Sequence, residues 1–188
     1  AFSLTATKRM SSNWQLTASV TLQNMTSANV FGETAQLNFR EFGRDPNDNV
    51  NSEGLSVRNR DVLGKAQLLY AGLPWELVLG IDWNYYTGYP TRRLVRVAET
   101  GLFSNVQTEP RTDDKRFPSV NLLNLRIQKD IPLGAGGARL SLLGNVFNLF
   151  NDDAVTDFRT DLATSEIYHT PSDVVQPRRL MIGAKVAF

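Results

Sequence analysis

The sequence contains no cysteine and a single histidine among its 188 residues. Without cysteine there is no disulfide framework, no thiolate metal site and no cysteine nucleophile. Charge of one sign does not dominate either, since 20 lysines and arginines nearly balance 19 aspartates and glutamates. The basic residues are scattered along the chain rather than gathered in a stripe, so we expect no nucleic-acid partner.

Long apolar runs are missing too. The longest, from Leu68 to Trp75, covers about eight residues, whereas a membrane-spanning helix needs roughly 18 or more. The start of the chain, from Ala1 to Thr5, lacks the charged and apolar regions of a signal peptide. If the protein is exported, we expect its export signal to lie upstream of Ala1.

What the sequence has instead is alternation of apolar and polar residues, the period of a β-strand, which is clean in the segments that begin at Trp14, Trp75 and Arg179 and less perfect in three others. Lys129 interrupts the apolar face of one such segment near its end, where its long side chain can reach a membrane interface. The pattern predicts about seven strands, at Ser3–Lys8, Trp14–Gln23, Val62–Tyr70, Trp75–Tyr86, Leu123–Ile131, Leu140–Val146 and Arg179–Phe188.

The connections between these segments alternate in length. Those at 10–13, 71–74 and 133–137 are short, and those at 28–56, 91–118 and 151–177 are long and expected to be structureless. Transmembrane barrels order their turns and loops in this way, whereas a sandwich has no such requirement.

Aromatic residues fall at both ends of the expected strands. On the apolar face, Trp83 and Tyr85 lie near a long connection, which suggests one interfacial girdle. A second girdle is expected beside the short turns and the chain end, from Trp14, Tyr70, Trp75 and Phe188.

We therefore predict an all-β fold in which residues 1–188 form about seven strands of a larger antiparallel transmembrane β-barrel. Alternation alone does not distinguish the inside of a sheet from its outside. A soluble β-sandwich binding module is therefore a remaining alternative.

Three segments carry a family resemblance. Asn145–Asn151 looks like a penultimate-strand signature, Arg178–Phe188 looks like a closing strand, and Tyr85–Thr91 is similar to the pattern that ends an upward strand. Together with the whole stretch Ser119–Asn151, they resemble the C-terminal barrel of TonB-dependent outer-membrane receptors. The resemblance is greatest to the subgroup that has a carboxypeptidase-regulatory-like N-terminal domain.

The resemblance implies energised uptake of a large nutrient, such as an iron chelate, a glycan or a peptide, across the outer membrane of a Gram-negative bacterium. It implies neither enzymatic activity nor a cofactor. Family members have about 22 strands around a plug, so we expect the missing strands and plug to come from the same parent chain or from other chains. A passive porin or adhesin barrel is the alternative within the outer membrane.

The same resemblance implies several partners. These are outer-membrane lipid and lipopolysaccharide, the remaining barrel and plug, the TonB complex through an absent N-terminal region, and the barrel-assembly machinery. The signal that this machinery would read is the alternating set of the last strand, namely Leu180, Ile182, Ala184, Val186 and Phe188.

Basic and aromatic residues at the long-connection side are candidate ligand contacts. Tyr86 and Tyr89 could offer a stacking platform to a ligand. Guanidinium groups there could bind lipopolysaccharide phosphates or an anionic substrate in bidentate fashion, although a salt-bridged rim is the simpler interpretation. The arginines concerned are Arg92, Arg93, Arg96, Arg178 and Arg179.

The sequence gives only weak support for a metal site or a catalytic site. Residues 45–54 superficially resemble a calcium loop, but Val50 stands where the turn needs glycine and Ser56 where a glutamate is required. Adjacent carboxylates at 113–114 and 152–153 rarely converge on one metal. His169 lies near Ser165 and Glu166 without a recognisable nucleophile or oxyanion motif, so we predict no catalytic site.

Overall fold

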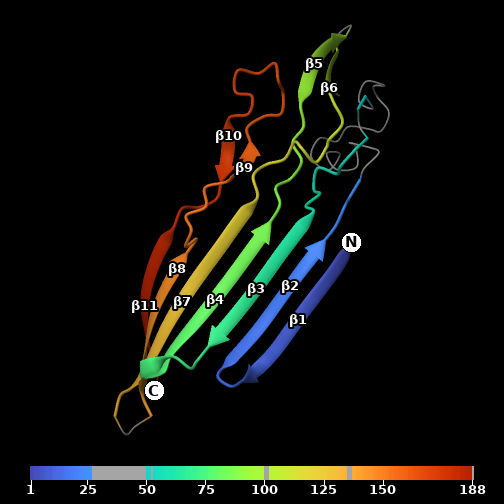
Figure 1. Cartoon of the computed structure of the whole chain (residues 1–188). Helices are drawn as coiled ribbons and strands as arrows, with labels where there is room; N and C mark the ends of the chain where they lie inside the picture. The colour runs from blue at the N-terminus through green and yellow to red at the C-terminus, as the bar shows by residue number, and fades with distance from the viewer. Residues whose placement is uncertain (27–49, 52, 100–101, 135–136, 188) are drawn as a thin grey trace.

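The structure, a computed structural model, describes residues 1–26, 50–51, 53–99, 102–134 and 137–187. Seven antiparallel strands form one sheet in the order β1-β2-β3-β4-β7-β8-β11 (Figure 1). The predicted all-β fold with a seven-stranded antiparallel sheet is confirmed. The strands are β1 (Phe2–Ser11), β2 (Trp14–Leu22), β3 (Val62–Tyr70), β4 (Leu77–Tyr86), β7 (Val120–Pro132), β8 (Arg139–Phe147) and β11 (Arg179–Ala187). Among the described residues, no helix has both the length and the apolar character that a membrane crossing requires.

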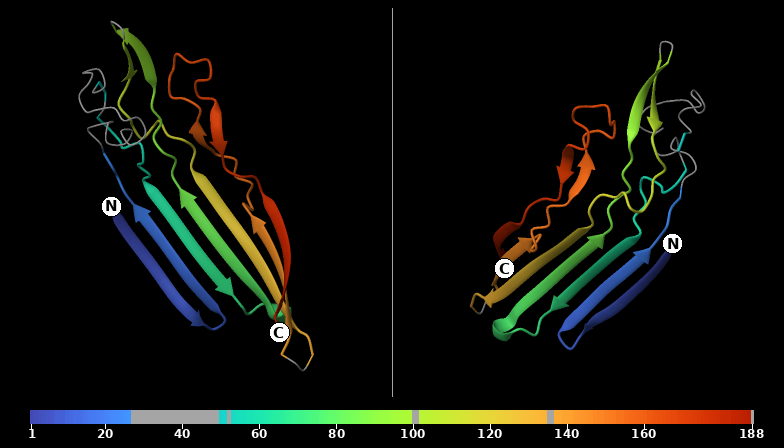
Figure 2. Two further views of the ribbon diagram at one scale, coloured as in Figure 1. Left: turned by 180° about the vertical axis from the view of Figure 1, so that it is seen from behind. Right: turned by 45° about the horizontal axis from the view of Figure 1, so that its top comes forward.

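The sheet has short turns at one end and long connections at the other (Figure 1). Two long connections contain hairpins, so the expectation that 91–118 and 151–177 are structureless is wrong. Each segment folds back on itself as an antiparallel pair of strands, and this local ladder gives the backbone N–H and C=O groups their hydrogen-bond partners. The hairpins continue past the end of the sheet (Figure 2). They are β5 (Leu94–Glu99) with β6 (Leu102–Gln107), and β9 (Val155–Phe158) with β10 (Pro171–Val174).

The turn before β4 differs from the sequence prediction. Trp75 and Glu76 have positive φ angles of 61° and 58° and belong to a 3-10 turn, η2 (Pro74–Glu76). A strand cannot pass through this left-handed conformation, so β4 begins at Leu77 and the prediction of Trp75 as a strand residue is wrong. Its side chain is 79% exposed at the turn end of the sheet.

The registers between neighbouring strands bring the apolar residues onto one side of the sheet. Ala18 lies opposite Ala6 and Ala66, and Leu68 lies opposite Leu16 and Ile81. The alternation therefore has the same phase in every strand, although a shift of one residue in any pair would reverse it. This apolar face carries, from β1 to β11, Leu4, Ala18, Leu68, Ile81, Leu125, Leu142 and Leu180.

The opposite side, the polar face, carries a hydrogen-bonded network across three strands. The carboxylate of Asp82 accepts hydrogen bonds from Gln67 (3.2 Å), Asn84 (3.0 Å) and Asn124 (3.0 Å). This network joins β3, β4 and β7 through neutral amide donors around one carboxylate. The polar face carries Thr5, Thr17, Gln67, Asp82, Asn124, Asn145 and Lys185.

In the described part of the chain, no second layer covers the sheet. The buried hydrophobic side chains there are Leu55, Val120 and Ala154, all near the long connections. By contrast, Leu180 is 76% and Ile182 is 90% exposed on the apolar face. The sheet is thus a single layer that is not closed into a barrel, with β1 at one edge and β11 at the other.

Candidate functional site

A cleft of about 610 Å³ opens where the polar face meets the long connections, and we call it the outer cleft. Four segments far apart in the sequence form it: the residues before β3, the end of β4 with the residues that follow it, the segment before β7 and the β9–β10 hairpin. The side chains that bear on its chemistry are Arg58, Arg60, Tyr86, Tyr89, Arg92, Asp157, Asp161 and Asp173.

Arg60 is held by two tyrosine rings in this cleft. Its guanidinium carbon lies 3.8 Å from the ring centroid of Tyr86 and 4.0 Å from that of Tyr89. Such contacts stabilise a cation through the negative face of the ring. The Nε atom is buried and has no hydrogen-bond partner among the described residues.

The β9–β10 connection is tied to the segment that precedes β5. Arg92 Nε donates to the Asp161 carboxylate at 2.6 Å, and the backbone amide of Leu94 donates to the Asp161 carbonyl at 2.9 Å. Both side chains of the ion pair are about one-quarter exposed, at 24% and 26%. This pairing positions the β9–β10 connection beside the start of β5.

The structure brings some of the predicted contact residues together. Tyr86, Tyr89 and Arg92 line the outer cleft, and Arg179 lines a neighbouring pocket of about 380 Å³ that Tyr86 shares. Arg93 and Arg178 line neither of these two pockets. The predicted cluster of arginines is therefore divided between adjoining sites.

The segment that follows β4 continues the ladder beyond the sheet. The Phe117 amide donates to the Tyr89 carbonyl (2.9 Å) and the Thr91 amide donates to the Lys115 carbonyl (2.8 Å). Gly88 allows this close approach, because a Cβ atom there would lie 1.9 Å from the Phe117 carbonyl oxygen. This ladder positions Tyr89 against Arg60.

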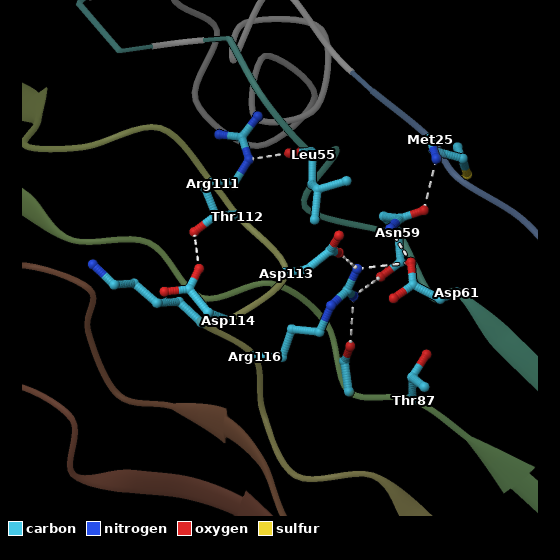
Figure 3. Close-up of polar contacts among 12 residues, drawn as sticks. Met25, Leu55, Asn59, Asp61, Thr87, Arg111, Thr112, Asp113, Asp114 and Arg116 are labelled. Atoms are coloured by element: carbon cyan, nitrogen blue, oxygen red, sulfur yellow. Dashed lines mark hydrogen bonds and ion pairs between the residues drawn. The ribbon is translucent and has the colours of Figure 1, made fainter.

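Beside the cleft, Arg116 holds three segments together (Figure 3). Its guanidinium donates to the carboxylates of Asp61 (2.8 Å) and Asp113 (2.7 Å), and to the backbone carbonyls of Asn59 and Gly88 (both 3.0 Å). The Arg116 side chain is only 11% exposed. It therefore links the residue before β3, the residue after β4 and the connection that precedes β7.

Asn59 extends this network and is fully buried. Its side chain accepts a hydrogen bond from the Met25 amide (2.7 Å) and donates one to Asp61 (2.7 Å), as Figure 3 shows. A second buried arginine, Arg111, donates to the Leu55 carbonyl and to the Gln107 side chain. The loop end of the sheet is thus ordered by buried polar contacts, which take the place of an apolar core.

Replacing Arg116 with glutamine is expected to loosen this loop end by roughly 2 kcal/mol, because hydrogen bonds to charged groups are stronger than neutral ones and the partner carboxylates are partly screened by solvent. Hydrogen exchange of the Met25 and Asn59 amides measures the effect. A matched control is Arg93→Gln, an exposed arginine of the same end. Unchanged protection in R116Q would contradict the assigned role.

The adjacent carboxylates do not converge. Asp113 pairs with Arg116, whereas Asp114 accepts a hydrogen bond from the Thr112 hydroxyl, which lowers the pKa of Asp114. Asp152 accepts hydrogen bonds from the backbone amides of Asn121 (2.7 Å) and Ala154 (3.0 Å). In the described ranges no three metal-binding side chains gather, and most of the segment 45–54 lies outside those ranges.

His169 is stacked among aromatic rings. Its ring centroid lies 4.4 Å from that of Phe158 and 3.8 Å from that of Tyr168. Phe158 in turn contacts Phe117 at 4.6 Å. These contacts connect the β9–β10 hairpin with the segment that precedes β7.

The segment Asn145–Asn151 forms the turn that ends β8. Asn148, 3% exposed and with a φ of 51°, donates to the carbonyls of Asp152 and Gln176 at 2.8 Å each. Its side-chain oxygen Oδ1 accepts from the backbone amide of Asp152 at 2.9 Å, and its backbone amide donates to the Asn124 side chain at 2.9 Å. The Asn148 side chain thus holds together the two ends of the β8–β11 connection, residues 151–177.

Sequence reasoning missed Arg60, Arg116 and the aspartates of the β9–β10 hairpin. No local pattern marks them, because their partners lie tens of residues away in the chain. Comparison of the chain with protein-family models, with curated proteins and with solved structures found no match.

Proposed function

We propose that the seven-stranded sheet is part of the wall of an outer-membrane β-barrel. The observation that carries this proposal is the uncovered apolar face, whose residues keep one phase across all seven strands. In water such a face would favour aggregation, whereas in a bilayer it contacts lipid. The polar face then lines an aqueous lumen. The strands have nine to thirteen residues, which meets the roughly 9–11 residues that a tilted strand needs to cross a bilayer.

Both ends of the apolar face carry side chains suited to a membrane interface. At the loop end, Trp83 and Tyr85 stack at 6.2 Å, and the indole of Trp83 donates to Asn121 at 2.7 Å. At the turn end, Trp14 lies opposite Tyr70. Amphipathic aromatic rings prefer these positions.

Lysines mark the turn end as well. Lys8 lies on the apolar side of β1, but its ammonium donates to the carbonyls of Ser11 (2.8 Å) and Trp14 (3.0 Å). Lys129 likewise donates to the Trp75 carbonyl. Both charges thus reach the turns, and the middle of the apolar face holds no charged group.

The two edges of the sheet support membership of a larger barrel. Unpaired backbone groups at β1 and β11 would be costly in lipid, so further strands would pair with both edges. Within the outer membrane, we assign the chain to the C-terminal wall of a TonB-dependent receptor. Its partners would be lipopolysaccharide, the plug, the TonB complex and the barrel-assembly machinery.

Three features agree with the family resemblance on which this finer assignment rests, although a passive porin or adhesin would share the strands. The segment Asn145–Asn151 closes β8 with a buried asparagine, and Gly88 allows the ladder beyond β4. The closing strand presents Leu180, Ile182 and Val186 on its exposed apolar side. Phe188, the last residue of the expected assembly signal, lies outside the described residues.

Single cysteines test the membrane wall, because the chain contains none of its own. In the full-length protein in native outer membranes, we expect Ile81→Cys to resist a water-soluble maleimide and Asp82→Cys to react. The reason is that adjacent strand residues face lipid and lumen respectively. A matched pair on another strand is Leu16→Cys and Thr17→Cys. Equal reactivity on both faces would contradict a membrane wall and favour a soluble module.

The gene upstream of Ala1 distinguishes a receptor from a passive barrel. A receptor requires further alternating strands, a globular plug and a coupling segment near the mature N-terminus. If a signal peptide immediately precedes Ala1, the receptor assignment is wrong and a small oligomeric barrel replaces it.

A further inference from the structure

The outer cleft has two walls of opposite charge. One wall, before β3, provides Arg58 and Arg60, and the other, on the β9–β10 hairpin, provides Asp157 and Asp173. The single ion pair that the structure forms between cleft residues, within the described ranges, is Arg92 with Asp161. The remaining charges are therefore directed to the cleft rather than to one another.

Arg60 is the most constrained of these groups. The rings of Tyr86 and Tyr89 contact its guanidinium, so the N–H edge is the part from which it can donate hydrogen bonds. No ion pair involves Arg60 among the residues that the structure describes. Its buried Nε is out of reach of a ligand, so an acceptor in the cleft would bind the terminal N–H groups of the guanidinium.

The geometry of the guanidinium group determines which kind of acceptor it binds best. Its N–H groups form a planar fork that matches the two oxygens of a carboxylate or phosphate. The tyrosine rings hold this fork in place before a ligand arrives, so little side-chain entropy is lost on binding. Arg58, exposed at the same wall, adds a second positive charge.

The acidic wall selects the other end of a ligand. The Asp157 carboxylate accepts one hydrogen bond from the adjacent Phe158 amide, and Asp173 is exposed. Both carboxylates retain acceptor capacity, and they would repel a ligand that is anionic throughout. A protonated amine facing them would be bound through charge-assisted hydrogen bonds.

We propose that the outer cleft binds a small dipolar ligand, with a carboxylate or phosphate on Arg60 and an amine toward Asp157 and Asp173. A volume of about 610 Å³ suits a small molecule or the terminal group of a larger one. As the substrate class of a receptor, this inference rests on the proposed function, since the cleft would then lie at the outer end of the lumen.

Equilibrium binding to the full-length protein in detergent tests the proposal. The probes are glucosamine 6-phosphate and triglycine, which carry an amine with a phosphate or a carboxylate. Glucose 6-phosphate and N-acetyl-triglycine are the matched probes without the amine. We expect one dipolar probe to bind at least tenfold more tightly than its matched probe, and the identity of that probe distinguishes phosphate from carboxylate.

Three variants test which wall of the outer cleft binds which group of the probe. Arg60→Gln is expected to weaken binding of the dipolar probe at least tenfold. Asp173→Asn should weaken that probe but leave its amine-free counterpart unchanged. Arg93→Gln, which alters an arginine that does not line the cleft, should bind as the parent protein does. Circular dichroism and heat-dependent electrophoretic mobility verify that each variant is folded.

Absence of saturable binding of every probe to the folded parent protein overturns the proposal, as does equal binding by R60Q. The cysteine-labelling experiment fails or succeeds independently. Two-sided labelling with intact probe binding would reject the membrane wall and retain the cleft, whereas one-sided labelling without probe binding would reject the cleft alone.

Discussion

Replacing Ala18 with lysine is expected to destabilise the protein in a bilayer by about 2–4 kcal/mol, the cost of a lysine on the lipid face of a barrel near the midplane. Ala18 is the middle residue of β2 and lies between Ala6 and Ala66 on the apolar face. Since the native side chain is one methyl group, the change removes almost no packing. The effect would therefore measure the transfer of charge into lipid.

The neighbouring substitution Thr17→Lys is the matched control. Thr17 is exposed on the polar face, between Thr7 and Gln67, so a lysine there would point into an aqueous lumen. We expect its effect to be within about 0.5 kcal/mol, as for an ordinary surface substitution. Denaturant unfolding in lipid vesicles and the yield of folded protein in the outer membrane are the measurements.

This pair of substitutions distinguishes a lipid-facing sheet from a soluble one. In a soluble sheet whose apolar face is simply uncovered, Ala18→Lys would be nearly neutral or would improve solubility. Equal tolerance of the two lysines would therefore contradict the barrel wall, whereas a loss confined to Ala18→Lys would support it.

Replacing Asn148 with alanine is expected to open the β8–β11 connection by lowering its free energy of local unfolding by about 3–4 kcal/mol. Three side-chain hydrogen bonds would be lost, each contributing roughly 1 kcal/mol. Alanine also tolerates a φ of 51° less well than asparagine, which adds about 1 kcal/mol. Hydrogen exchange of the Asp152 amide and protease sensitivity of residues 151–177 report the opening.

Two further variants separate the hydrogen-bond contribution from the backbone contribution and provide a control. Asn148→Gly also removes the hydrogen bonds but accepts the positive φ, so its effect should be about 1 kcal/mol smaller than that of alanine. Asn145→Ala changes a residue on the polar face within the same segment, and it should leave the β8–β11 connection protected from hydrogen exchange and proteolysis. Equal protection in N148A and the parent protein would show that the turn is held by other contacts.

Most of the sheet could be predicted from the alternation. The bounds of β3 agree with the predicted Val62–Tyr70, and β8 and β11 differ by a residue at most at each end. The prediction failed where the backbone leaves the extended region, as at Trp75, whose left-handed φ no apolar–polar pattern reveals. It also treated as loop the hairpin β5–β6, which is short and lies outside the main sheet.

The candidate site could be predicted only in part. Tyr86, Tyr89 and Arg92 are close together in the sequence and follow a clear strand, so their common location could be inferred. Arg60 precedes a different strand, and Asp173 lies in a distant hairpin. Their approach to Tyr86 depends on strand order and on the ladder of residues 89–91 with 115–117, which the sequence does not encode locally.

The sequence by itself determined the strands, their two-sided character and the alternation of short and long connections, because the period of a strand is a property of adjacent residues. Only the tertiary structure decided that the seven apolar sides coincide on one face, since a slip of one residue at any pairing would move a whole strand's apolar set to the other side. It likewise decided that Arg60 and Asp173, oppositely charged and more than a hundred residues apart in the chain, line the same outer cleft.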